Sequence, residues 1–162
     1  MTKPKVCFFT GHRIIPKAKH AEIESWLRRD ILDKINQRIT VFITGGALGF
    51  DTMAAEQIIT LREDYDFIKL CLYLPCKNQD AMWSEANKKR FERIKKLADE
   101  VHYITKSEHT PGCMKKRNQA MVDASDFCIS YLINSRSGSA QTVKMAEAKG
   151  IDIANIADRV GL

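Results

Sequence analysis

The stretch Ile43-Thr44-Gly45-Gly46-Ala47-Leu48-Gly49-Phe50-Asp51 runs from an apolar, β-branched segment through three glycines into a segment with helical spacing. Glycines at such a strand-to-helix turn permit positive φ and let backbone N–H groups approach an anion closely. The start of the helix adds a partial positive charge. A tight turn explains the glycines equally well, so this motif alone leaves a phosphate site and a plain turn open.

The same alternation of strand and helix extends along the whole chain. Short apolar runs rich in β-branched and aromatic residues occur at 6–10, 40–44, 68–74, 100–104, 126–132 and 151–155. Segments with apolar residues at three- and four-residue intervals separate them, which is typical of a parallel sheet flanked by helices. We predict an α/β fold, a Rossmann-like three-layer sandwich with a mostly parallel sheet of about six strands. Its length predicts one domain over residues 1–162.

Composition limits the classes of function. The chain has 162 residues, of which 44% are hydrophobic, and no apolar run approaches the roughly 20 residues of a membrane span. We therefore expect a cytoplasmic protein with no membrane partner. Its five cysteines form no Cys-x-x-Cys pair, so we expect core thiols, with neither a disulfide framework nor a metal site.

A formal net charge of +6 suits an anionic partner. Most of the excess lies in clusters that we expect to be solvated helix faces: Lys88-Lys89-Arg90, Arg93, Lys95-Lys96 and Lys115-Lys116-Arg117. A nucleic-acid surface is the less favoured interpretation, because aromatic residues do not interleave with these charges as they do in single-strand binders.

The first strand ends in Phe9-Thr10-Gly11-His12-Arg13. Since all strand-to-helix turns of a parallel sheet meet at one edge, this segment should lie beside the glycine turn. Arg13 can make a bidentate contact to phosphate. His12 can donate to a phosphate, act as general acid or serve as a hydrogen-bonded structural residue, and its place at a strand end favours function.

Asp51 stands at the start of the second helix. Its carboxylate can cap backbone donors there, or it can accept hydrogen bonds from a ribose or a base. Glu56 lies five residues later, toward another side of the helix, so the two do not form an acid/base couple. No catalytic residue is fixed by these patterns, and the candidates are His12, Asp51 and Glu56.

A third polar turn connects the fifth predicted strand to the next helix. Its sequence is Asn134-Ser135-Arg136-Ser137-Gly138-Ser139-Ala140-Gln141-Thr142. Ser137 or Ser139 can be a simple N-cap. Three such turns at one edge nevertheless favour a ligand with several phosphate or hydroxyl groups. Arg117 and Asn118, early on the fourth helix, should lie near the same edge.

Taken in order, several motifs resemble one known family. They are the Thr-Gly-His-Arg strand end at 10–13, the glycine turn at 44–51 with Ala54-Ala55-Glu56, and Arg117-Asn118 followed by Met121-Val122-Asp123-Ala124-Ser125-Asp126. Together they are similar to the YpsA-like branch of the SLOG superfamily, named for the Smf/DprA DNA-processing proteins and the LOG cytokinin-activating hydrolases. The likeness covers residues 6–156.

The resemblance implies a Rossmann-like fold with a pocket for nucleotides or nucleotide-derived ligands related to ADP-ribose or NAD. It implies a ligand-binding set consisting of Thr10, Gly11, His12, Arg13, Gly45, Gly46, Gly49, Asp51, Arg117, Asn118, Ser137, Gly138, Ser139 and Thr142. Within that set, the glycines of the 45–49 turn and Asp51 would line the phosphate and ribose side. Arg117 would correspond to an arginine that the hydrolases place on their fourth helix.

One departure bears on activity. The hydrolases carry Pro-Gly-Gly-x-Gly-Thr-x-x-Glu after the fifth strand, and aligning Gly138-Ser139 with Gly-Thr places their catalytic glutamate at Thr142. A hydroxyl cannot replace that carboxylate as a base or stabilise an oxocarbenium ion. Whether the chain is an enzyme therefore stays open.

We expect a protein that binds a nucleotide-type small molecule, as a sensor or sequestering protein in a bacterial or prophage setting, with no cofactor required. The first alternative is a nucleotide-processing hydrolase that cleaves an N-glycosidic or phosphoester bond. The second is DprA-like binding of single-stranded DNA. The sequence leaves assembly into a homo-oligomer open.

Overall fold

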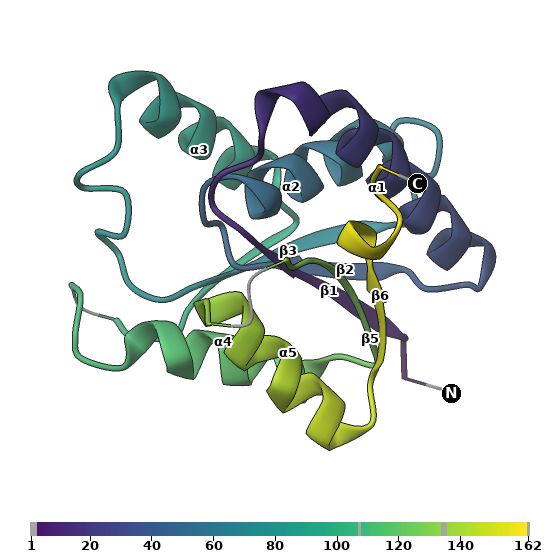
Figure 1. Ribbon diagram of the computed structural model, residues 1–162. Helices are drawn as coiled ribbons and strands as arrows, with labels where there is room; N and C mark the ends of the chain where they lie inside the picture. The colour runs from purple at the N-terminus through teal and green to yellow at the C-terminus, as the bar shows by residue number, and fades with distance from the viewer. Residues whose placement is uncertain (1–2, 107, 134–135, 162) are drawn as a thin grey trace.

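A six-stranded parallel sheet forms the middle layer of the protein (Figure 1). The computed structural model describes residues 3–106, 108–133 and 136–161. The strands are β1 (Val6–Gly11), β2 (Val41–Thr44), β3 (Lys69–Leu74), β4 (Glu100–Tyr103), β5 (Phe127–Tyr131) and β6 (Asp152–Asn155). Their spatial order is β4-β3-β2-β1-β5-β6, and each neighbouring pair is parallel. The predicted sheet is confirmed.

Helices cover both faces of this sheet, which confirms the three-layer sandwich. One face carries α1 (His20–Asn36), α2 (Phe50–Leu61) and α3 (Glu85–Leu97), and the other carries α4 (Cys113–Ala124) and α5 (Gly138–Lys149) (Figure 1). Two short 3₁₀ helices, η1 (Lys17–Lys19) and η2 (Ile156–Asp158), complete the described elements. In the described part of the chain, no helix has the length and apolar composition that spanning a bilayer requires.

Strand β1 shows why the apolar runs of this sequence are continuous. Cys7 and Phe9 pack into the core beneath α1, α2 and α3, while Val6 and Phe8 pack into the core beneath α4 and α5. A strand with helices on both sides buries alternate residues in two separate cores. Its sequence therefore lacks the polar alternation of a half-exposed strand.

The five cysteine thiols are unpaired and buried. Burial raises the pKa of the Cys7 thiol to about 12, and burial near Glu100 raises that of Cys71 to about 12. Such thiols stay protonated and serve as small apolar groups. Cys113 is the first residue of α4.

The order of the strands creates a crevice between β1 and β5. From β1 through β2 and β3 to β4, the chain moves across the sheet in one direction, and α1, α2 and α3 fall on one face. It then returns past β1 to β5 and β6, which places α4 and α5 on the other face, as right-handed crossovers require. Ligands in open sheets bind at this kind of reversal, beyond the carboxyl ends of the strands.

A lysine at the end of α5 fixes α5 against α4. The Lys149 ammonium donates to the carbonyl oxygens of Val122, Asp123 and Ser125, at 2.9, 2.8 and 3.0 Å. These carbonyl groups lie at the end of α4, where carbonyl oxygens run short of backbone partners, and that of Val122 also accepts from the Ser125 N–H. A cation there also complements the helix dipole.

We expect Lys149→Met to lower the free energy of unfolding by about 1–2 kcal/mol, because three carbonyl groups lose a charged donor. Thermal or urea denaturation followed by circular dichroism measures the change. Lys144→Met is the matched control, since Lys144 is exposed on the same helix and has no hydrogen bond or ion pair among the described residues. Equal stabilities of the two variants would contradict the assigned role of Lys149.

Candidate functional site

A cavity of about 340 Å³ opens at the crevice between β1 and β5, and we call it the central cavity. It combines residues from the ends of β1 and β2, from α4 and from the start of α5. Its lining consists of Thr10, Gly11, His12, Arg13, Ala47, Asp51, Met114, Arg117, Asn118, Met121, Ser137, Gly138 and Ser139.

The structure brings most of the predicted ligand-binding residues into this lining. All of Thr10-Gly11-His12-Arg13 lies there, together with Asp51, Arg117-Asn118 and Ser137-Gly138-Ser139. Four predicted residues do not line the central cavity: Gly45, Gly46, Gly49 and Thr142. Asn134 and Ser135, from the predicted third turn, lie outside the described residues.

Arg117 forms the buried cationic wall of the central cavity. Its side chain is only 5% exposed, and its guanidinium donates to the carbonyl oxygen of Gly45 and, at 2.8 Å, to Oδ1 of Asn118. Burial lowers the pKa of Arg117, while the negative charge of Asp51 opposes that shift. An arginine held in this way presents a fixed positive charge in a region of low dielectric, where it acts strongly on an anion.

Asp51 lies in the first turn of α2, but it does not cap that helix. Gly49 is the N-cap, and the Asp51 carboxylate accepts instead from the backbone N–H of Ala47 at 3.2 Å. Burial raises the pKa of Asp51 to about 6, although Arg117, the Ala47 amide and Arg13 all favour the ionised form. A carboxyl group in a cavity wall with this pKa can exchange a proton near neutral pH.

The glycine turn has a packing role in this structure. A Cβ on Gly45 would lie 2.5 Å from Nη1 of Arg117, and one on Gly49 would lie 2.3 Å from the carbonyl oxygen of Arg13. Gly46 and Gly49 also have φ of 70° and 78°, which side chains rarely tolerate. The turn thus lets Arg117 and the segment after β1 approach closely, rather than lining the central cavity with its own glycines.

His12 is held as a neutral imidazole. Its Nε2 accepts a hydrogen bond from the backbone N–H of Ile133 at 2.9 Å, so the ring proton resides on Nδ1. Burial lowers the pKa of His12, in keeping with that neutral form. The residue joins the segments after β1 and β5, and its Nδ1–H remains a donor for a ligand. This geometry does not favour a general acid at Nε2.

Arg13 and the start of α5 supply the open anion-binding groups. Arg13 is exposed, and its guanidinium has no hydrogen bond or ion pair among the described residues. Ser137 is the N-cap of α5 and accepts from the Ala140 N–H at 3.1 Å, and Ser139 Oγ donates to the Gly11 carbonyl at 2.8 Å. These bonds fix the helix start so that its partial positive charge meets the central cavity.

The two remaining candidates for catalysis or binding lie elsewhere. Thr142 is fully buried, and its hydroxyl donates to the Gly138 carbonyl at 3.1 Å. Glu56 forms a bidentate ion pair with Arg90 of α3. Neither carries a group into the central cavity, so His12 and Asp51 are the catalytic candidates that line it.

Sequence reasoning missed part of the lining. Met114 and Met121 lie on the same face of α4 as Arg117 and Asn118, at spacings of three and four residues. From the sequence alone, both methionines fit the apolar stripe of the helix. The sequence does contain a signal for this role. An apolar stripe that is interrupted by an arginine and an asparagine at helical spacing indicates a helix face that lines a cavity at that point rather than the core.

Two further hollows adjoin the central cavity. The first, of about 320 Å³, shares Arg13, Ala47 and Met114 with it, and we call it the loop hollow. The second, of about 220 Å³, shares Arg13 with the central cavity and includes Gly49. Arg13 therefore borders all three spaces.

The basic clusters of α3 are partly neutralised. Lys88 pairs with Glu85 at 3.7 Å and Lys95 with Glu92 at 2.6 Å, each one helical turn apart. Exposed pairs of this kind are typical of a solvated helix face. They support that interpretation over a nucleic-acid surface on α3.

The chain is similar to proteins of one known family. The family model described as the YspA SLOG family matches residues 10–155. The SPbeta prophage-derived protein YoqJ of Bacillus subtilis is 32% identical over 117 residues, which are 65% of this chain and 68% of that protein. These matches confirm the resemblance drawn from the motifs.

Two solved structures share the fold. DNA processing protein A of Streptococcus pneumoniae matches with a TM-score of 0.65 and 21% identity, over 93% of this chain and 49% of that one. The second is DNA processing protein A of Helicobacter pylori, whose structure was described for its single-stranded DNA binding mode. It matches with a TM-score of 0.66 and 18% identity, over 96% of this chain and 71% of that one. This chain spans about half the length of the streptococcal protein.

The raised pKa of Asp51 predicts a pH-dependent cost to stability. In the folded protein the Asp51 carboxyl group keeps its proton up to about pH 6, whereas in the unfolded chain it loses the proton near pH 3.8. The free energy of unfolding therefore falls as the pH rises between these two values. We expect the free energy of unfolding of the Asp51→Asn variant to equal that of the native protein near pH 4 and to be about 3 kcal/mol higher at pH 7.

Urea denaturation of both proteins across this pH range measures the difference in the free energy of unfolding. The titration of His12 affects both proteins equally and cancels in the comparison. An Asn oxygen can still accept from the Ala47 amide, which keeps the fold comparable. A variant that is less stable than the native protein at pH 7 would show that the ionised carboxylate stabilises the fold.

Proposed function

The chain belongs to the YspA SLOG family, and we propose that it binds a nucleotide or nucleotide-derived small molecule, with a phosphate group in the central cavity. The observation that carries this proposal is the convergence of three positive elements on one cavity: the exposed Arg13, the buried Arg117 and the start of α5. A phosphate needs several separate donors, and this cavity supplies them.

The size and the polar lining support the same ligand class. A volume of about 340 Å³ is at the lower end of small-molecule sites, and the adjoining hollows extend the space. Asp51 supplies an acceptor for ribose hydroxyl groups beside the phosphate-binding groups. ADP-ribose, NAD and AMP all combine these features, so a sensor or sequestering protein for such a molecule is the function that we favour.

We expect Arg13→Gln to weaken binding of the best ligand among AMP, ADP-ribose and NAD by about tenfold or more, because a charge-assisted bidentate contact is lost. Isothermal titration calorimetry measures the affinities. Because Arg13 is exposed and has no hydrogen bond or ion pair in the described part of the chain, the fold should be unaffected. Arg28→Gln is the matched control, since it removes the same charge from the exposed face of α1.

Two outcomes would argue against the proposal. The first is the absence of binding across this panel by correctly folded protein. The second is an equal loss of affinity in the Arg13 and Arg28 variants, which would indicate attraction by overall charge rather than a defined phosphate contact.

One observation favours hydrolysis as a second candidate function. Asp51 lines the central cavity with a pKa raised to about 6, which suits a general acid or base near neutral pH. In this alternative, the Asp51 carboxyl group would assist cleavage of an N-glycosidic or phosphoester bond. Thr142 cannot take that part, because its hydroxyl is buried against the Gly138 carbonyl.

Incubation with AMP, followed by chromatography for free adenine and an assay for free phosphate, separates the two candidates. Hydrolysis predicts turnover that Asp51→Asn reduces by about a hundredfold or more, which is the usual contribution of a general acid or base. Tight binding with no released product would leave the binding function in place and exclude AMP as a substrate.

A further inference from the structure

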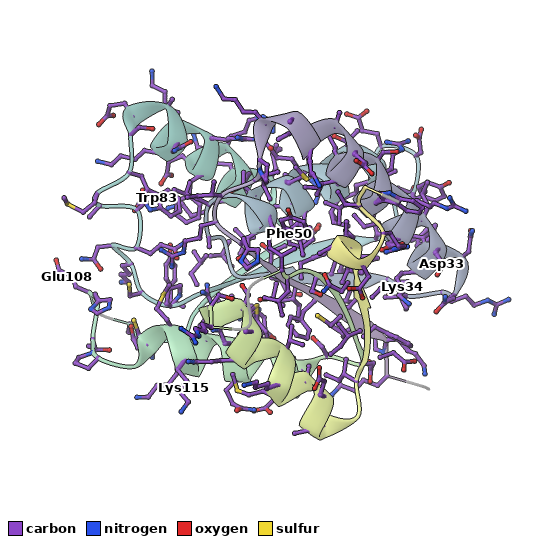
Figure 2. The ribbon with its side chains drawn as sticks, viewed as in Figure 1. Asp33, Lys34, Phe50, Trp83, Glu108 and Lys115 are labelled. Atoms are coloured by element: carbon purple, nitrogen blue, oxygen red, sulfur yellow. The ribbon has the colours of Figure 1, made fainter. Side chains whose placement is uncertain are left out.

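The loop hollow lies between two irregular segments at the β3–β4 end of the molecule. One segment follows β3 and contains Trp83, and the other follows β4 and contains Glu108 (Figure 2). The backbone N–H of His109 donates to Oδ1 of Asn78 at 2.9 Å and ties the two segments together. The hollow shares Arg13, Ala47 and Met114 with the central cavity, so the two spaces adjoin.

Two side-chain amides border the loop hollow, and each is oriented by one hydrogen bond. The Gln79 Nε2 group donates to the Gly46 carbonyl at 3.1 Å, which leaves its Oε1 as a free acceptor. Oδ1 of Asn78 is occupied by the His109 amide, which leaves its Nδ2 as a free donor. No further partner of either amide is found among the described residues, so the hollow presents one oriented acceptor and one oriented donor.

Trp83 adds an aromatic surface to the same space. Its ring packs against Phe91 at a centroid distance of 5.2 Å and an interplanar angle of 59°, which fixes its position, and it stays partly exposed beside the hollow. An aromatic ring next to an amide donor and an amide acceptor is the arrangement that proteins use to stack a nucleobase and read its edge.

We infer that the loop hollow is a base subsite that takes the purine of a nucleotide whose phosphate lies in the central cavity. The base stacks on Trp83, and its edge donates to Oε1 of Gln79 and accepts from Nδ2 of Asn78. A bicyclic purine gives the indole a larger stacking surface than a pyrimidine does. This inference rests on the proposed function, and it names the class of nucleotide.

The test compares AMP, UMP and ribose 5-phosphate, each titrated by calorimetry and by tryptophan fluorescence. The protein has two tryptophans, and Trp26 lies away from the hollow, against Arg29 and Arg159. In a Trp26→Phe background the fluorescence therefore reports Trp83 alone. We expect AMP to quench it and to bind about tenfold more tightly than ribose 5-phosphate, with UMP between them.

Two variants assign the effect to the loop hollow. Trp83→Leu should reduce the affinity for AMP by about tenfold, to near that of ribose 5-phosphate, since stacking is lost. Gln79→Met keeps the length of the side chain but removes its amide, and it should lower the affinity for AMP by about fivefold. Neither change should alter the binding of ribose 5-phosphate, which does not reach the hollow.

The outcomes separate this inference from the proposal on which it rests. Equal affinities for AMP and ribose 5-phosphate, with Trp83 unquenched, would overturn the base subsite and leave phosphate binding intact. Equal quenching and affinity for UMP and AMP would overturn the assignment to purines. Absence of binding by all three compounds would overturn the base subsite as stated here, and absence of binding by ADP-ribose and NAD as well would overturn the proposed function.

Discussion

The neighbouring strands β1 and β5 send the chain to opposite faces of the sheet, and the candidate site depends on this constraint. The segment after β1 leads toward α1 on one face of the sheet, and the segment after β5 leads toward α5 on the other. Because these segments diverge, they leave a space beyond the carboxyl ends of the two strands. Hydrogen bonds fix the segments that follow the two strands relative to each other, among them Ile133 N–H to His12 and Ser139 Oγ to the Gly11 carbonyl. The central cavity is therefore a product of topology, and local residues set its chemistry.

The buried pair of charges at Gly45 gives the central cavity its electrostatic character. Arg117 reaches this point from α4 and Asp51 from α2, across the carboxyl end of β2. Their opposite charges partly offset each other's desolvation, as the directions of their pKa shifts indicate. Only a residue without a side chain at Gly45 allows both to approach, which explains the glycine in physical terms.

Much of the fold and of the site could be predicted because both follow from local patterns. The apolar run of β1 and the small residues Ala54 and Ala55 on α2 indicate burial without reference to distant contacts. The carboxyl-edge rule then places the segment at 10–13 beside the start of α5. The role of Gly45 could not be predicted in the same way, because it depends on Arg117, a residue 72 positions away.

The loop hollow illustrates the same limit. Cys76, Asn78, Gln79 and Trp83 come from the one segment that follows β3, whereas His109 joins them from the segment that follows β4. Its contribution depends on a backbone hydrogen bond between two irregular segments, which no periodicity signals. Residues whose roles come from tertiary pairing of loops are the ones that pattern analysis misses.

A crystal structure of the protein soaked with AMP tests the central claim most directly. The account predicts phosphate density in the central cavity, between the Arg13 guanidinium and the first backbone amides of α5. Density for the phosphate on the outer face of α3, with the central cavity filled by solvent, would contradict it.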